Sequence, residues 1–208
     1  MTEPTPESTP ERVVLNSQTL KGVAHPIRLR LLGLLREDGP STATKLAERI
    51  GQSSGVTSYH LRQLAQVGLV VDVTDQGGGR ERWWKAAHRS TTLDADQIRE
   101  SPVEGEAYMR AIASAYAERM DRWLGEMPLA PADWDEGATL SDFNLRLTAA
   151  QASELIVRLT DLIHEYPNHF PDVEAPEDTE RVIVQLQVMP FLRSVAGRQA
   201  GTQTGEAA

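Results

Sequence analysis

Small and hydrogen-bonding side chains recur at helical spacing in one short stretch of the chain. Ser58, Tyr59 and Arg62 lie three, four and seven positions after Gly55, which places all four on one face of a helix. Hydroxyl groups and a guanidinium can bind phosphate oxygens, and arginine can also bind guanine. This face is therefore suited to contact with duplex DNA.

The remaining positions of the same stretch have the character of a packing face. Thr57, His60, Leu61 and Leu64 share it at the same spacing. Because His60 falls among apolar residues, we interpret it as a core or capping histidine rather than as a direct DNA contact.

Two helices joined by a tight turn would position this face. The first has the apolar positions Ala43, Leu46, Ala47 and Ile50. Ser41 or Thr42 can cap it, and Gly51 supplies the turn. The second, capped by Ser53 or Ser54, runs to about Val67 and is ended by Gly68. Before them, an apolar stripe over residues 20–37 is interrupted by Pro26, so one short helix ends near His25 and another begins there.

A β-hairpin follows, with strands at residues 69–74 and 81–86 and a glycine tip at residues 76–79. Arg80, Arg82 and Trp84 share one strand face, and Trp83 points to the other. Arginines at a glycine tip suit phosphate or minor-groove contact. The predicted DNA-contacting residues are Thr42, Lys45, Ser53, Ser54, Gly55, Ser58, Tyr59, Arg62, Gln63, Arg80 and Arg82.

The distribution of charge agrees with this assignment. The chain has 208 residues and a net charge of −9. Residues 12–92 carry 12 Lys or Arg against 6 Asp or Glu, a net charge of +6, whereas residues 93–208 carry a net charge of −12. The basic excess lies with the predicted DNA reader, and the acidic remainder should serve another purpose.

Three segments resemble a known family. They are residues 24–32, residues 58–64 with Gly68-Leu69-Val70, and residues 79–84. Together they are similar to the ArsR-type winged helix-turn-helix transcription regulators, in an actinobacterial-like subgroup with an extended C-terminal region. The resemblance covers residues 17–90 and implies a homodimer that binds a palindromic operator and usually represses. Metal-sensing members carry cysteines in the helix before the turn. This chain has no cysteine, so sensing through thiolates is not available.

The C-terminal region predicts a long helix over residues 105–126, with an apolar stripe of Met109, Ile112, Tyr116, Met120 and Trp123. We interpret it as a dimerisation helix. Alternation at residues 143–147 and 182–188, with an amphipathic helix between them, predicts a small β-α-β region. The fold class is α+β. The predicted divisions are a disordered tail (1–14), a winged helix-turn-helix domain (15–92), a C-terminal dimerisation domain (93–196) and a second disordered tail (197–208).

Several functions stay open or are not expected. The β-α-β region either binds a small-molecule effector, with Trp134, Phe143 and Tyr166 near a pocket, or only enlarges the dimer core. One group of residues could in principle bind a metal: Asp161, His164, Glu165 and His169. We interpret them instead as the charged end of a helix before a loop. We expect no cofactor, no catalytic site and no membrane span, and a cytoplasmic location.

The sequence therefore predicts a homodimeric DNA-binding transcription regulator. Repression is implied by the resemblance alone. Two alternatives remain. One is a winged helix used for protein–protein contact. The other is a zinc-responsive regulator using Asp161 and His164.

Overall fold

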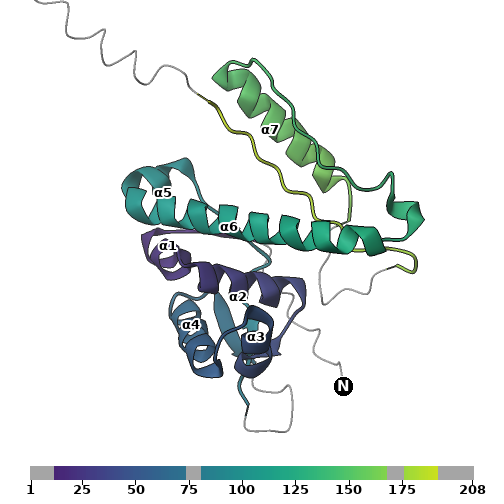
Figure 1. Cartoon of the computed structure of the whole chain (residues 1–208). Coiled ribbons are helices and arrows are strands. Elements are labelled where there is room, and N and C mark those ends of the chain that lie inside the picture. The colour runs from purple at the N-terminus through teal and green to yellow at the C-terminus, as the bar shows by residue number, and fades with distance from the viewer. Residues whose placement is uncertain (1–11, 74–80, 168–175, 192–208) are drawn as a thin grey trace, which may run out of the picture. The chain divides into compact units, whose positions relative to one another are not determined.

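A computed structural model of the chain describes residues 12–73, 81–167 and 176–191, and these form two compact units. The first unit comprises residues 1–139 and 169–180, and the second comprises residues 140–168 and 181–208. Residues 1–11 of the predicted N-terminal tail (1–14), the predicted tail at residues 197–208, the hairpin tip, Arg80 and His169 lie outside the described residues. Figure 1 shows the order of the elements.

The first unit begins with a strand that the sequence did not predict. Strand β1 (Arg12–Val14) pairs in parallel with β5 (Ser90–Thr92), inside the segment expected to be a tail. Leu15, which follows β1, is fully buried, and its N–H donates to the carbonyl of Thr92 at 2.9 Å. This anchor explains why residues 12–15 are ordered.

Two helices meet at Pro26, as predicted. Helix α1 (Ser17–Val23) begins at the cap Asn16, and α2 (Pro26–Glu37) begins after His25. Nδ1 of His25 accepts from the N–H of Ile27 at 3.2 Å. Proline at the first helical position lacks only an N–H that would have no intrahelical partner there.

The helix-turn-helix consists of α3 (Ala43–Ile50) and α4 (Ser54–Gln66). Thr42 caps α3 and Ser53 caps α4, each accepting a backbone N–H at 3.3 Å. Gly51, at φ 68°, lies in the left-handed region between the two helices, where a glycine carries no Cβ penalty.

An antiparallel sheet completes the winged fold in the order β2-β4-β3. Its strands are β2 (Ser41–Thr42), β3 (Val70–Val73) and β4 (Trp83–Ala86). Across the hairpin Val73 is opposite Trp83, and Asp72 is opposite Trp84. The core below combines fully buried side chains of α1, α2, α3 and α4, among them Leu20, Leu31, Leu35, Leu46, Leu61 and Leu64, with Trp84 of β4.

One buried hydroxyl in this core predicts a stabilising substitution. Thr57 is fully buried, and within the described residues its Oγ1 has no hydrogen-bond partner. Thr57→Val should raise the free energy of unfolding by about 1 kcal/mol, because it replaces a buried, unsatisfied hydroxyl with a methyl group of similar size. Urea unfolding followed by tryptophan fluorescence measures this in the first unit, which contains all four tryptophans.

Thr44→Val is the matched control, since the hydroxyl of Thr44 bonds to Glu81 at 3.1 Å on the surface. It should bring no gain. A lower urea midpoint for Thr57→Val than for the unchanged protein would contradict the assignment.

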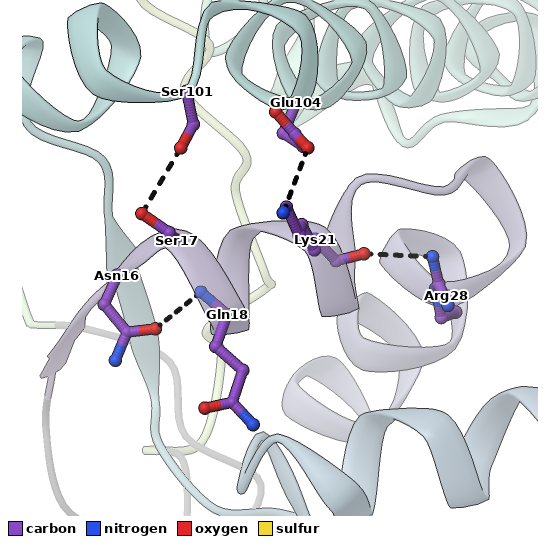
Figure 2. A network of polar contacts seen from close by, with 7 residues as sticks. All are labelled: Asn16, Ser17, Gln18, Lys21, Arg28, Ser101 and Glu104. Carbon is purple, nitrogen blue, oxygen red and sulfur yellow. Dashed lines mark hydrogen bonds and ion pairs between the residues drawn. The ribbon is translucent and has the colours of Figure 1, made fainter.

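After the wing, α5 (Ala95–Glu100) leads into the long helix α6 (Pro102–Glu126). Helix α6 packs against α1 and α2 of its own chain (Figure 1). Polar contacts fix its first turns: the hydroxyls of Ser101 and Ser17 are 3.3 Å apart, and Lys21 pairs with Glu104 at 3.6 Å (Figure 2).

The covered face of α6 keeps four residues of the predicted stripe, which are half-buried: Ile112, Tyr116, Met120 and Trp123. It departs from the stripe at the start of the helix. Tyr108 and Ala111 are buried, whereas Met109 is 51% exposed. The Tyr108 hydroxyl lies 3.2 Å from that of Thr91 in β5, so a tertiary contact determines which residue faces inward. Helix α6 belongs to the first unit, whose first segment runs to residue 139.

Two short 3-10 helices, η1 (Met127–Leu129) and η2 (Ala132–Trp134), follow α6 in the first unit. No helix among the described residues is both long and apolar enough to cross a membrane.

The second unit contains α7 (Ala149–His164), which confirms the predicted amphipathic helix capped by Thr148. The prediction of a strand on either side of α7 is wrong, because residues 140–147 and 181–191 are assigned to no strand. Sequence alternation supplies a strand with an apolar face, but a strand also requires a neighbour for its main-chain groups. The single chain supplies none in this described region.

Candidate nucleic-acid interface

Helix α4 has the two faces that the sequence predicted. Its buried residues are Thr57, His60, Leu61 and Leu64. Tyr59 is 53% exposed, Arg62 is exposed, and Ser58 on the same face is half-buried. The polar face is thus available to a ligand, and the apolar face holds the helix on the core.

The start of α4 is also open. Ser53, Ser54 and Gly55 are exposed. The hydroxyl of Ser53 is used as the cap, while the first-turn N–H groups of a helix attract anions such as phosphate. Gly55 has no atom within 4 Å of the position of a Cβ, so close packing does not require a glycine here.

A hollow of about 350 Å³ separates α4 from the wing. It joins the start of α3, the exposed face of α4 and the first residues of β4. Its lining residues are Thr42, Ala43, Thr44, Ser58, Arg62, Glu81, Arg82 and Trp84. The predicted readers Ser58 and Arg62 therefore share one concave surface with the wing residue Arg82.

Arg82 is held at the base of the wing by two contacts. Its Nε lies 2.8 Å from Oδ2 of Asp72, and its guanidinium lies 5.4 Å from the centre of the Trp84 ring. Its side chain is still 58% exposed. An exposed ion pair contributes little stability, so a phosphate can compete with Asp72 for this arginine.

Residues of α3 complete the surface. Lys45 is exposed, and its ammonium lies 4.7 Å from the centre of the Trp83 ring. Trp83 is half-buried and Trp84 is 4% exposed, which confirms that one of the two packs in the core. Thr42 is buried at 1% exposure, and its hydroxyl accepts the N–H of Lys45. Its position supports α3 from below the surface.

The structure thus brings most of the predicted residues onto α4, the start of α3 and the base of the wing. Gln63 lies half-buried on α4. Sequence reasoning missed three residues of this surface: Thr44, Glu81 and Asp72. Glu81 accepts a hydrogen bond from Thr44, and Asp72 forms an ion pair with Arg82. Asp72 follows from the hairpin register, but Thr44 and Glu81 are 37 residues apart and meet only in the folded chain.

Two histidines lie behind the recognition face. The rings of His25 and His60 are 4.6 Å apart, and His60 is 8% exposed, as expected for a core position. Burial lowers the pKa of both rings from the ordinary value of 6.5. The positive charge of Arg28 lowers the pKa of each further, and His25 adds to the effect on His60.

These shifts predict a loss of stability in mild acid. Below about pH 6.5 the unfolded chain binds protons that the folded histidines resist, so the free energy of unfolding falls as the pH drops toward the folded-state pKa values. Urea unfolding at about pH 7.5 and 5.5, where carboxylates stay charged, should show this in the tryptophan signal. His60→Gln should reduce the difference between the two pH values.

The exposed His164 on α7 offers the control, because His164→Gln leaves the pair at His25 and His60 intact. It should keep the full pH difference of the first unit. An unchanged difference in His60→Gln would contradict the role of the pair.

The described residues do not form a group of ligands for the zinc-responsive alternative. Asp161, His164 and Glu165 are all exposed at the end of α7. Among the residues that the structure describes, no three His, Asp or Glu side chains gather where they could hold a metal ion.

Comparison with known proteins places the first part of the chain. Residues 23–73 match a family model described as "Helix-turn-helix domain". The curated "HTH-type transcriptional regulator NmtR" of Mycobacterium tuberculosis (strain ATCC 25618 / H37Rv) is 46% identical over 55 residues. This match covers 26% of the present chain and 45% of the relative, so the chain spans less than half of the length of that relative.

Solved structures are also similar. One is described as "Possible transcriptional regulator for arsenical resistance", with 27% identity, 52% of this chain and 95% of that chain covered, and a TM-score of 0.30. Another is a mutant of Lactococcus lactis ZitR in its apo form, with 16% identity, coverage of 68% and 83%, and a TM-score of 0.31. Both TM-scores are low, so the similarity of this chain to helix-turn-helix proteins rests on the two sequence matches.

Residues 23–73 are a helix-turn-helix domain. The hairpin of β3 and β4 that follows α4 adds a wing to this helix-turn-helix.

Proposed function

We propose that this protein is a DNA-binding transcription regulator that binds a palindromic operator as a homodimer and represses. The observation that carries the proposal is the exposed polar face of α4, with Ser58 and Arg62 lining one hollow together with Arg82 of the wing. The face lies inside the segment that matches the helix-turn-helix family. In this arrangement the second helix enters the major groove and the wing follows the flanking backbone.

The chemistry of the hollow fits a phosphate-lined groove. Arg62 can reach guanine or phosphate, while Arg82 and Lys45 supply positive charge at the edges. The carboxylates of Asp72 and Glu81 engage Arg82 and Thr44. Binding to DNA exchanges these surface contacts for phosphate contacts, which are stronger because each phosphate also releases counterions.

A selection from random duplex DNA, followed by a salt titration, tests the proposal. We expect an enriched site with two-fold symmetry, whose half-sites are about one helical turn (roughly 34 Å) apart. Two chains should bind each duplex. The logarithm of affinity should fall linearly with the logarithm of salt concentration, because phosphate contacts dominate binding.

A lack of binding to any duplex at low salt would favour the protein–protein alternative. A selected site without symmetry, bound by one chain, would reject the homodimer while leaving DNA binding in place. Repression itself is tested by a reporter gene behind the selected site, whose output should fall when the protein is expressed.

A further inference from the structure

Val56 is an apolar residue on the outside of α4. It is the third residue of the helix, after the cap Ser53, and it is 39% exposed. Leu61 and Leu64 of the same helix are fully buried in the core. A β-branched residue also has a lower helix propensity than alanine. Val56 therefore adds little to the core or to the helix, and a contact at the surface is the role that remains.

Gly55, the residue before Val56, lies in the same first turn of α4. It does not adopt the left-handed conformation of Gly51. Among the described residues, no atom lies within 4 Å of the position that its Cβ would take. Neither a turn nor packing within the chain thus requires glycine here, and glycine in a helix is less stable than alanine. A missing Cβ does allow the surface of a ligand to come close to the backbone.

Val56 lies on a different side of α4 from the hollow beside the wing. Ser58 and Arg62 line that hollow, and Val56 does not. Tyr59 and Gln63 follow Val56 by three and seven positions, which places these three residues on one side of the helix. Helix α4 therefore offers positive charge for phosphates toward the wing and an apolar contact on its other side.

We propose that Val56 contacts the 5-methyl group of a thymine in the major groove, and that Gly55 allows the close approach which this contact requires. The inference rests on the DNA binding of the proposed function and names a base that the protein distinguishes. In a helix-turn-helix the first residues of the second helix contact the base edges. The thymine methyl is the apolar group that the major groove presents, and apolar side chains recognise it. Cytosine lacks this methyl in unmodified DNA, so a contact with Val56 favours thymine.

Replacement of thymine by uracil in the selected duplex tests the contact, because it removes only the methyl group. We expect one position of the half-site at which uracil weakens binding of the unchanged protein by about fourfold for each methyl removed, or about fifteenfold when both half-sites are changed. Val56→Ala should bind the thymine duplex more weakly by a similar factor. It should no longer distinguish the thymine duplex from the uracil duplex by more than about twofold, since the two changes remove the same contact.

Val71→Ala is the matched control, because Val71 of β3 is 38% exposed and the substitution is the same. It should keep the full difference between the thymine and uracil duplexes. Gly55→Ala gives a second test of the close approach. Its added methyl group should weaken binding to the thymine duplex by about tenfold, while the urea midpoint of the tryptophan signal should stay unchanged or rise.

The outcomes separate this contact from the proposed function. A preference for thymine over uracil that persists in Val56→Ala would assign the methyl contact to another residue and overturn the proposal. Equal binding of the unchanged protein to thymine and uracil duplexes at every position would also overturn it, while leaving DNA binding in place. Unchanged affinity in Gly55→Ala would overturn the role of Gly55. A lack of binding to any duplex would overturn the proposed function and this contact together.

Discussion

Replacing Arg62 with alanine is expected to weaken binding to the selected duplex by about tenfold to a hundredfold. Arg62 is exposed on α4 and lines the hollow beside the wing. The substitution removes a charged contact to base or phosphate but no part of the core. The urea midpoint of the tryptophan signal should therefore stay where it is. Fluorescence anisotropy with a labelled duplex measures the affinity.

Arg110→Ala provides the control for the loss of one positive charge. Arg110 lies on α6, where it pairs with Glu106 at 2.7 Å, and its side chain is 79% exposed. Its removal should leave duplex affinity within about threefold, because exposed charges far from the contact are screened. Equal losses in the two variants would indicate a general charge effect, and no loss in Arg62→Ala would mean that the recognition face is misassigned.

Replacing the neighbouring Leu61 with alanine should have the opposite effect: it should lower stability and leave duplex affinity almost unchanged. Leu61 is fully buried in the core below α4. Leu61→Ala should lower the free energy of unfolding of the first unit by about 2 to 5 kcal/mol, since it loses apolar contact and leaves a cavity. Urea unfolding with tryptophan detection measures this loss.

Val56→Ala on the same helix is the matched control, because Val56 is 39% exposed. It should cost less than about 1 kcal/mol. Where Leu61→Ala is still folded, its duplex affinity should lie within about threefold of the unchanged protein, since the reading face is intact. A large loss of affinity in the folded variant would show that packing and reading are not separated on α4.

Adjacent residues of α4 can be assigned in this way because its helical period is strong. Apolar residues three and four positions apart identify the packing face, and the polar residues between them must face outward. The sequence therefore predicted the buried set of α4, including His60, and narrowed each helix cap to two neighbouring residues, of which Thr42 and Ser53 are the caps in the structure. Local signals of this kind depend on few partners.

Contacts between distant segments were not predictable in the same way. The pairing of β1 with β5 joins segments almost eighty positions apart, and the Thr44 contact to Glu81 spans the wing. The burial of Tyr108 instead of Met109 depends on Thr91. No periodicity encodes these choices, because several registers satisfy the same apolar pattern.

The sequence by itself determined the order of helices, the turn at Gly51, the two faces of α4 and the positive charge of the region that carries them. Each follows from backbone preferences and periodicity within about ten residues. Only the tertiary structure decided that Ser58, Arg62 and Arg82 line one hollow. The tertiary structure likewise decided that Asp72 pairs with Arg82 and that Glu81 accepts a hydrogen bond from Thr44. It also decided that the segments beside α7 form no strands in one chain. Pairing and clustering are properties of chain parts that burial brings together, so local sequence patterns do not encode them.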